Sequence, residues 1–212
     1  MPKAQSGFTL VEIAIVLVII GLLLGGVLKG AELIENSRVR QAVNQINGVT
    51  ASFYAYQDRY NRIPGDDGNA ATVQARGSSW AAVGAGNNNG LLEVNNNQAF
   101  TGAGEGQEFF QHLKAAGFIT GNPADAGAAA LPRNPFGGLV GVSSQAMMGA
   151  LNGNKVCLNR VNGKAAQAID NQLDDGNGAT GQLRASQAAA PANGALATPY
   201  NEDQEYTICM RM

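Results

Sequence analysis

The chain has 212 residues, which is enough for one long helix and one globular domain of ordinary size. Only 14% of the residues are charged and the formal net charge is −2, so bulk electrostatics gives no reason to expect a nucleic-acid partner. Glycine is abundant, with 28 residues, and Asn, Ala and Gly cluster in the second half, which indicates long, turn-rich connections.

An almost uninterrupted apolar stretch runs from Phe8 to Leu28. As a helix rising ~1.5 Å per residue it would be about 30 Å long, which is enough to cross the hydrocarbon core of a bilayer. Thr9, Glu12 and several glycines are the exceptions within it. An isolated carboxylate in hydrocarbon costs about 2.5–3.5 kcal/mol, so Glu12 requires a partner.

The residues Gly7-Phe8-Thr9-Leu10-Val11-Glu12, followed by the apolar run, resemble the prepilin cleavage and methylation motif of type IV pilins and type II secretion pseudopilins. The resemblance implies that residues 1–7 are a leader peptide, that a prepilin peptidase cuts between Gly7 and Phe8, and that Phe8 is then methylated. It also implies that Glu12, the fifth residue after cleavage, pairs with the N-terminal amine of a neighbouring subunit. The motif is specific because it needs the leader, the Gly, the aromatic residue, the spaced Glu and the apolar run together.

A different interpretation is a single-pass anchor that never polymerises, with Glu12 lying near the lipid headgroups. That interpretation makes Gly7 and Phe8 coincidences. The charges on either side of the apolar run mark its topology only weakly. The family resemblance, more than the charge count, therefore places the C-terminal domain outside the cytoplasm.

Apolar residues continue beyond Leu28 at helical spacing and form a stripe on one face: Val39, Val43, Ile46, Val49, Phe53, Tyr56 and Tyr60. We therefore expect one helix from about Phe8 to Tyr60, with its first half in a membrane or filament core and its second half packed under a head. Many pilins have a proline near the end of the apolar segment, and this chain has none, so its glycines would have to supply any local melting.

The segment Ile63-Pro64-Gly65-Asp66-Asp67 ends this helix, because Pro64 disfavours helical geometry at Ile63 and turn-forming residues follow. Preceded by Tyr60, the segment also resembles the junction found in many pilin-like proteins. Its two aspartates, with Asn69, could ligate a cation, although a solvated turn is the interpretation that we favour. Residues 70–104 are loop-like, and we expect Trp80 to anchor them onto the head.

The rest of the chain alternates between short helices, strands and loops. We expect helices at about 105–116 and 164–173, strands at 138–142, 146–151, 155–161 and 205–212, and a long loop at 185–200. Asn152-Gly153 predicts a hairpin turn between the second and third of these strands. His112 lies off the apolar face of the first helix, so we expect it at the surface or at the boundary of the core.

The two cysteines, Cys157 and Cys209, lie in predicted strands. A disulfide is the default expectation for a domain exported past the membrane, and two buried free thiols are the alternative. A metal site is not expected, since the single His112 has no Cys or His at ligand spacing. Asp174 and Asp175 are weak candidates for calcium, because their stretch is rich in oxygen ligands but lacks the spacing of an EF-hand loop.

The sequence thus predicts an α+β, type IV pilin-like fold: a helix over 8–60 with a transmembrane segment at 8–28, and a head over 61–212 with an antiparallel sheet. No nucleophile–base pair or paired carboxylates can be argued from spacing, so we expect no enzyme and no cofactor. The expected function is a structural subunit of a type IV pilus-like filament. The alternatives are a pseudopilin of a type II secretion system and a membrane-anchored binding module that does not polymerise.

The expected partners follow from the resemblance: other copies of the chain or other pilins, the prepilin peptidase, an assembly platform in the inner membrane, and the lipid bilayer before assembly. The precursor would lie in the bacterial inner membrane with its head outside. The assembled subunit would be in an extracellular pilus, serving adhesion, motility or DNA uptake, or in a periplasmic pseudopilus. The disulfide and the size of the head favour the pilus.

Overall fold

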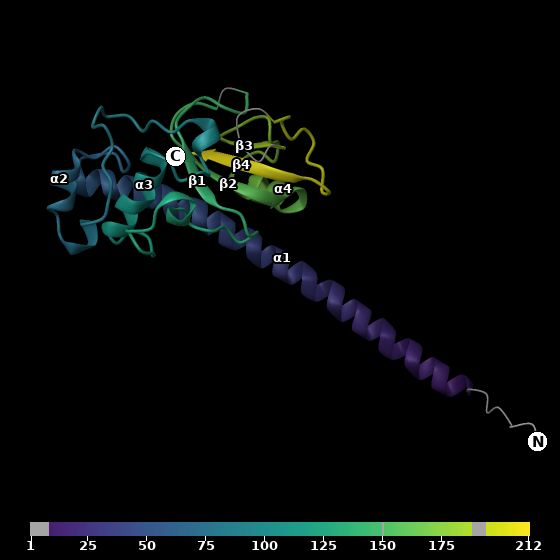
Figure 1. The fold of residues 1–212 in the computed structure, drawn as a ribbon. Coiled ribbons are helices and arrows are strands. Elements are labelled where there is room, and N and C mark those ends of the chain that lie inside the picture. The colour runs from purple at the N-terminus through teal and green to yellow at the C-terminus, as the bar shows by residue number, and fades with distance from the viewer. Residues whose placement is uncertain (1–8, 150, 188–193) are drawn as a thin grey trace, which may run out of the picture. The chain divides into compact units, whose positions relative to one another are not determined.

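The computed structural model describes residues 9–149, 151–187 and 194–212 (Figure 1). It has the expected α+β class, with a long N-terminal helix followed by a four-stranded antiparallel sheet. The chain forms two compact units that divide between Arg38 and Val39. The second half of the helix therefore belongs to the same unit as the head, and each unit is described by itself.

Helix α1 runs from Leu10 to Tyr60, a length of 51 residues. All described residues from Thr9 to Lys29 are exposed. Beyond Arg38 one face is buried at helical spacing, by Val39, Ala42, Ile46, Val49, Ser52, Phe53 and Tyr56. This is the predicted stripe, and it shares one hydrophobic core with the sheet and with helix α3 (Glu105–Ala115).

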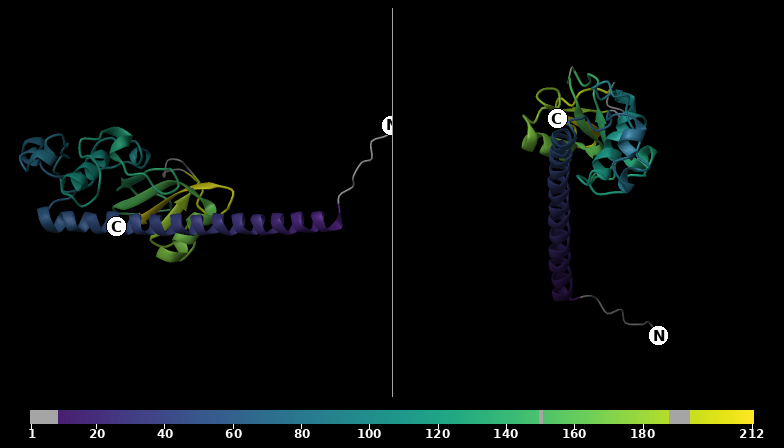
Figure 2. Two further views of the ribbon diagram at one scale, coloured as in Figure 1. Left: turned by 90° about the horizontal axis from the view of Figure 1, so that it is seen from below. Right: turned by 90° about the vertical axis from the view of Figure 1, so that its left-hand side faces the viewer.

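The sheet has the strand order β1-β2-β4-β3, and every pairing is antiparallel. Its strands are β1 (Val140–Ser143), β2 (Lys155–Asn162), β3 (Leu183–Ser186) and β4 (Glu205–Arg211). The last strand therefore lies between two earlier ones, and Figure 2 shows it among them from a second direction. Cys157 of β2 lies directly opposite Cys209 of β4, and the two form a disulfide.

Helix α4 (Gly163–Leu173) follows β2 without a loop. Its N-cap is Asn162, whose side chain accepts a hydrogen bond from the backbone N–H of Ala165 at 2.8 Å. The shorter helical segments are α2 (Ala70–Gln74) and three 3₁₀ turns at Ser78–Trp80, Asn96–Gln98 and Gly127–Ala130. Trp80 is buried, as expected for a residue that anchors its loop.

Two expectations about the sheet are wrong. The described residues of the predicted strand 146–151, which are 146–149 and 151, form no strand but a single bridge between Met147 and Leu151, because Met148 and Gly149 adopt φ values of 48° and 71° and turn the chain back. The predicted hairpin at Asn152-Gly153 is therefore absent. Strand β3 overlaps the start of the predicted loop 185–200, and its short sequence, Leu-Arg-Ala-Ser, gives little alternation from which to predict it.

Candidate functional site

The N-terminal end of α1 is closed by a reciprocal pair of hydrogen bonds between Thr9 and Glu12. The backbone N–H and the hydroxyl of Thr9 both donate to Oε2 of Glu12 at 2.8 Å, and the backbone N–H of Glu12 lies 3.3 Å from the Thr9 hydroxyl oxygen. This arrangement is a capping box, and it places a negative charge where the helix dipole favours one. The predicted cleavage site, Gly7 and Phe8, lies outside the described residues.

The first half of α1 presents apolar side chains on all sides. Those at least 60% exposed are Leu10, Val11, Leu17, Val18, Leu22, Leu23, Leu24, Val27, Leu28 and Leu33. The helix contains a segment long and apolar enough to cross a membrane, and none of that segment is buried within the protein. A continuous apolar surface of this kind marks a site covered by lipid or by another protein surface.

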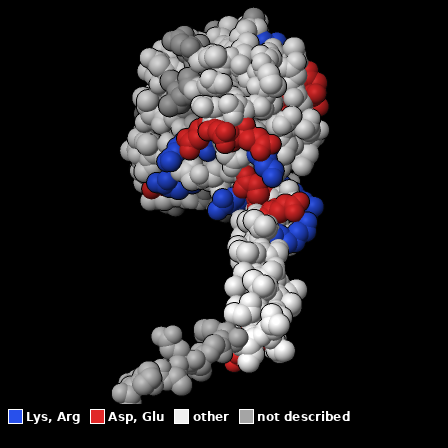
Figure 3. Space-filling model, turned by 90° about the vertical axis from the view of Figure 1, so that its right-hand side faces the viewer, with Lys and Arg blue, Asp and Glu red and all other residues white. Residues whose placement is uncertain are grey.

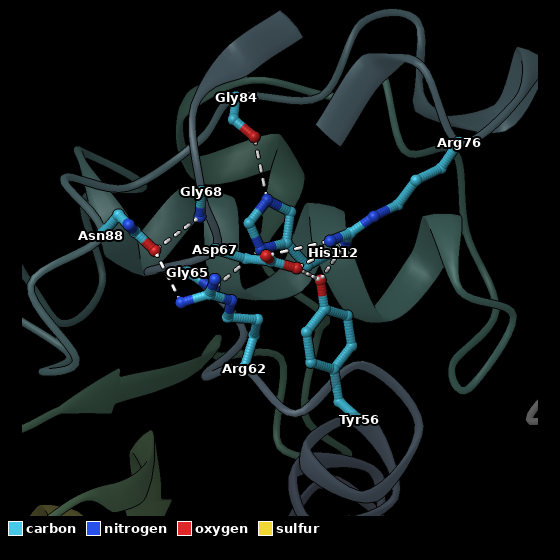
Figure 4. A network of polar contacts seen from close by, with 9 residues as sticks. All are labelled: Tyr56, Arg62, Gly65, Asp67, Gly68, Arg76, Gly84, Asn88 and His112. Carbon is cyan, nitrogen blue, oxygen red and sulfur yellow. Dashed lines mark hydrogen bonds and ion pairs between the residues drawn. The ribbon is translucent and has the colours of Figure 1, made fainter. Parts of the chain in front are cut away.

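A second polar site lies where α1 ends, and Figure 4 shows it. Arg76 binds both carboxylate oxygens of Asp67, with Nη2 at 3.0 Å from Oδ1, and the hydroxyl of Tyr56 donates to Oδ2 of the same carboxylate. Burial alone would raise the pKa of Asp67, but the hydrogen bonds from Arg76 and Tyr56 outweigh it and keep that pKa below 3.8. Burial and the Asp67 carboxylate raise the pKa of Tyr56 far above its usual range. The three side chains tie the turn after α1 to the helix itself.

His112 is fully buried in the same region, so its predicted position at the surface or at the boundary of the core is wrong. Its ring stacks on Tyr56, with centroids 5.9 Å apart. Nδ1 accepts a hydrogen bond from the backbone N–H of Gly65 at 2.9 Å, and Nε2 lies 2.8 Å from the carbonyl oxygen of Gly84, to which it donates. Burial lowers the pKa of His112. The neutral ring bridges two loops that are distant in sequence, which spacing on the helix alone could not reveal.

Asp66 is also buried, so the expected solvated turn is wrong. Its carboxylate accepts hydrogen bonds from three successive backbone N–H groups: that of Asn88, that of Asn89 at 3.2 Å and that of Gly90 at 2.6 Å. These donors occupy both carboxylate oxygens, so the residue fits a structural role better than cation binding. Gly65 beside it has a φ of 95°, and a Cβ there would lie 2.7 Å from the carbonyl oxygen of Glu105.

The arrangement around Tyr56 offers no general base. Both ring nitrogens of His112 are engaged by backbone groups, and the Asp67 carboxylate is neutralised by Arg76. The polar groups of this junction therefore act on structure: they fix the end of α1 against the head.

The weak calcium candidates lie after α4. The carboxylates of Asp174 and Asp175 come together with that of Asp170, which the sequence did not single out, and one oxygen of each lies within 4.8 Å of the others. Asp174 also accepts a hydrogen bond from the backbone N–H of Leu183 at 2.8 Å, and Asp175 accepts one from that of Asn177 at 2.9 Å. These bonds shape the loop, and calcium at this cluster stays a prediction.

Comparison with known proteins bears on the first of these sites. Residues 2–28 match the family model described as the prokaryotic N-terminal methylation motif. This range includes the predicted cleavage site and the capping box at the start of α1. A search of curated proteins finds no match to the chain.

Proposed function

We propose that this chain is a subunit of a type IV pilus. The premise is its N-terminal methylation motif, which is the signature of type IV pilins and pseudopilins. The signature belongs to structural subunits and implies processing by a prepilin peptidase and assembly into a filament. It also suits a precursor anchored in the membrane by the apolar part of α1.

The observation that carries the proposal is the exposed apolar half of α1 with a single carboxylate, that of Glu12, in its first turn. The cap with Thr9 leaves the negative charge of Glu12 without a cation among the described residues, which is costly for a helix end that enters an apolar environment. Cleavage before Phe8 creates an amino cation next to the apolar segment. Between neighbouring subunits the amine of one and the carboxylate of the other lower each other's desolvation cost.

The proposed sequence of events begins with the precursor in the inner membrane and its head outside. The peptidase removes residues 1–7 and methylates Phe8, and the assembly platform then adds the subunit to a growing filament. The apolar helices pack against one another as the core of the filament. Glu12 sets the stagger between subunits, because a subunit docked one step out of register leaves two charges unpaired in an apolar core.

The choice of a pilus over a pseudopilus rests on the head. Its disulfide joins the two central strands of the sheet, and its core extends from α1 across the sheet to α4. The disulfide fits either compartment, because the bacterial periplasm is oxidising as well. A large, covalently stabilised head suits a filament that is exposed outside the cell. A pseudopilin would carry the same N-terminal motif but would remain in the periplasm.

The first experiment is the intact mass of the chain isolated from its native membrane, with fragmentation from the N-terminus. A chain that begins at methylated Phe8 supports processing by the peptidase. A chain that still begins at Met1 in cells with an active peptidase contradicts the filament and supports a simple anchored module. Shearing the cells then separates the two filament types, because only an extracellular pilus is released into the medium.

A second experiment addresses Glu12 directly. Glu12→Ala should lose filament assembly while the chain stays in the membrane, because the amine of the neighbouring subunit then has no partner. Glu32→Ala is the matched control, since it removes an exposed carboxylate from the same helix outside the apolar segment. Wild-type filament yield from Glu12→Ala would contradict the role proposed for Glu12.

A further inference from the structure

The head carries a groove of about 560 Å³ that is bordered by two arginines. Arg133 and Arg160 line it together with small residues, among them Ala129 and Gly137, and its lining contains no carboxylate. We call it the arginine groove. Its small side chains leave room for an incoming segment, and its two guanidinium groups give it a positive charge.

The wall that carries Arg133 is held rigidly by the side chain of Asn134. The amide oxygen accepts hydrogen bonds from the backbone N–H groups of Phe136 at 2.9 Å and Gly138 at 3.1 Å. The amide nitrogen donates to the carbonyl oxygens of Asn159 at 2.7 Å and Leu139 at 3.2 Å. All four hydrogen-bonding positions of the amide are therefore used, and a groove fixed in advance loses less entropy on binding.

The opposite wall is formed by an irregularity in β2. The pairing of β2 with β4 shifts register between Leu158 and Val161, and Arg160 within this bulge has a φ of 58°. A non-glycine residue rarely adopts this conformation, and bulges commonly redirect a side chain. Here the bulge places Arg160 at the border of the groove.

The two arginines have little to neutralise them within their own chain. Among the described residues Arg133 has no ion pair, and Arg160 has one, to Glu205 at 3.8 Å. Both members of that pair are more than 60% exposed, so it contributes little and can be exchanged for another carboxylate.

An acidic surface of the same chain complements the groove. Residues Glu202–Glu205 include three acids and are all exposed, and we call them the acidic turn. The turn is ordered: the backbone N–H of Asp203 donates to the side chain of Asn201 at 2.9 Å, and the carbonyl oxygen of Gln204 accepts from Gly163 at 2.9 Å. Figure 3, which looks onto the side of the head where β4 begins, shows a band of acidic side chains with basic ones at its ends.

We propose that the arginine groove of one copy binds the acidic turn of the next copy in the filament. This inference rests on the proposed function. The groove and the turn adjoin on each copy, where Arg160 lies 3.8 Å from Glu205, so the turn of the next copy would replace this ion pair with one between copies. A contact that is made in one direction only leaves one groove and one turn free. Contacts of that kind build an open chain of subunits instead of a closed dimer. Complementary charge would also select the correct partner and speed its docking.

The test is charge reversal with rescue in the full-length chain. Arg133→Glu and Asp203→Arg should each lower the filament mass recovered from cells by at least about tenfold, because like charges then face each other. The double variant should return to within about threefold of wild type, since the pair is restored in reverse. Arg211→Glu is the matched control: it makes the same charge change at an exposed residue outside the groove, at the end of β4 opposite to the acidic turn, and should assemble normally. Single variants that assemble like wild type, or a double variant no better than the worse single one, would overturn the proposal.

Cross-linking in the membrane separates this inference from the proposed function. Copies with Ala129→Cys and copies with Gln204→Cys, both changes at exposed positions, are expressed together and oxidised. A cross-linked dimer is expected for this pair and not for Ala82→Cys with Gln204→Cys. Its absence would overturn the contact whether or not filaments form. A cross-link between these two variants in cells that form no filaments would support the contact but contradict the proposed function as a filament subunit.

Discussion

The two halves of α1 share one helical geometry, but their apolar side chains are in opposite environments. From Leu10 to Leu28 the helix is apolar on every side, and none of the residues that the structure describes in its own unit covers it. From Val39 to Tyr56 a single stripe is apolar, and the head covers it. A helix that is apolar all round must be buried by something outside the chain, whereas a striped helix can be buried by its own domain.

The polar groups of the two halves differ in the same way. Tyr56, in the second half, finds Asp67 and Arg76 in its own chain. Glu12, in the first half, is held only by the cap with Thr9, and no cation pairs with it among the described residues. The second half is therefore complete in a monomer, and the first is completed by a neighbour or a membrane.

The largest expected effect tests whether side-chain burial explains the difference in stability contribution between the two halves of α1. Ile46 is 1% exposed, and Ile46→Ala should destabilise the head by about 2–5 kcal/mol through lost burial and a cavity. Ile15 is 55% exposed, and Ile15→Ala should leave the unfolding of the head unchanged. Denaturant unfolding of the detergent-solubilised full chain, followed by the fluorescence of the single tryptophan, Trp80, measures both. Equal effects at the two positions would contradict the view that only the second half of α1 is buried by its own domain.

The next effect tests whether the polar groups of the second half stabilise the monomer. Asp67→Asn should cost about 1.5–3 kcal/mol, because it removes a charged hydrogen-bond acceptor from Tyr56 and Arg76. Asp58→Asn, at an exposed position near the end of α1, should change stability by less than about 0.5 kcal/mol. Because the folded pKa of Asp67 is lowered, its contribution is present above pH 3.8 and is lost as the pH falls further. A cost that is unchanged in acid would contradict this assignment.

A third prediction concerns Glu108, a partly buried carboxylate on α3 whose pKa is raised, unlike that of Asp67. Burial and the neighbouring carboxylates of Glu105 and Asp66 raise the pKa of Glu108 from 4.5 to about 7. The folded head thus keeps a proton that the unfolded chain loses, and its stability falls as the pH rises through this range. Since the side chain is partly exposed, the loss as the pH rises from 4.5 to about 7 should be only about 1–2 kcal/mol. Glu108→Gln should show a flatter pH profile in urea unfolding, and an unchanged profile would assign the titration elsewhere.

The smallest expected effect on stability comes from replacing a glycine in each half of α1 by alanine. A Cβ added at Gly25 or Gly48 would meet nothing within 4 Å, so both positions accept alanine. Gly48→Ala should stabilise the head by about 0.5–1 kcal/mol, because alanine has the higher helix propensity. Gly25→Ala should stiffen the first half without moving the unfolding midpoint of the head. A shift of that midpoint by Gly25→Ala would show that the halves are coupled.

The sequence was most informative where one physical signal dominates. The spacing of Val39, Ile46 and Phe53 predicts the buried face of α1, and the apolar run with Glu12 predicts the motif that the family comparison finds. It was least informative where loops distant in sequence meet. His112 looks like a surface residue on its helix, and only the approach of Gly65 and Gly84 makes it a buried bridge.

The same limit applies to short irregular segments. Strand β3 has four residues and is recognised by its partner β4 more than by its own pattern. Asp66 sits in a sequence typical of a solvated turn, but the three N–H groups at 88–90 that bury it lie more than twenty positions away. Arg160 carries no sign of its unusual backbone, because the bulge arises from the pairing of β2 with β4.

The link between Cys157 and Cys209 has a consequence for proteolysis. It closes the chain from one strand to the other into a covalent ring that contains α4, β3 and the exposed residue Lys164. A protease that cuts after Lys164 opens the ring but releases no fragment. The nicked chain would run as a single species without reductant and as two with it. In the proposed filament, many heads could therefore be cut while every part of the surface stays attached.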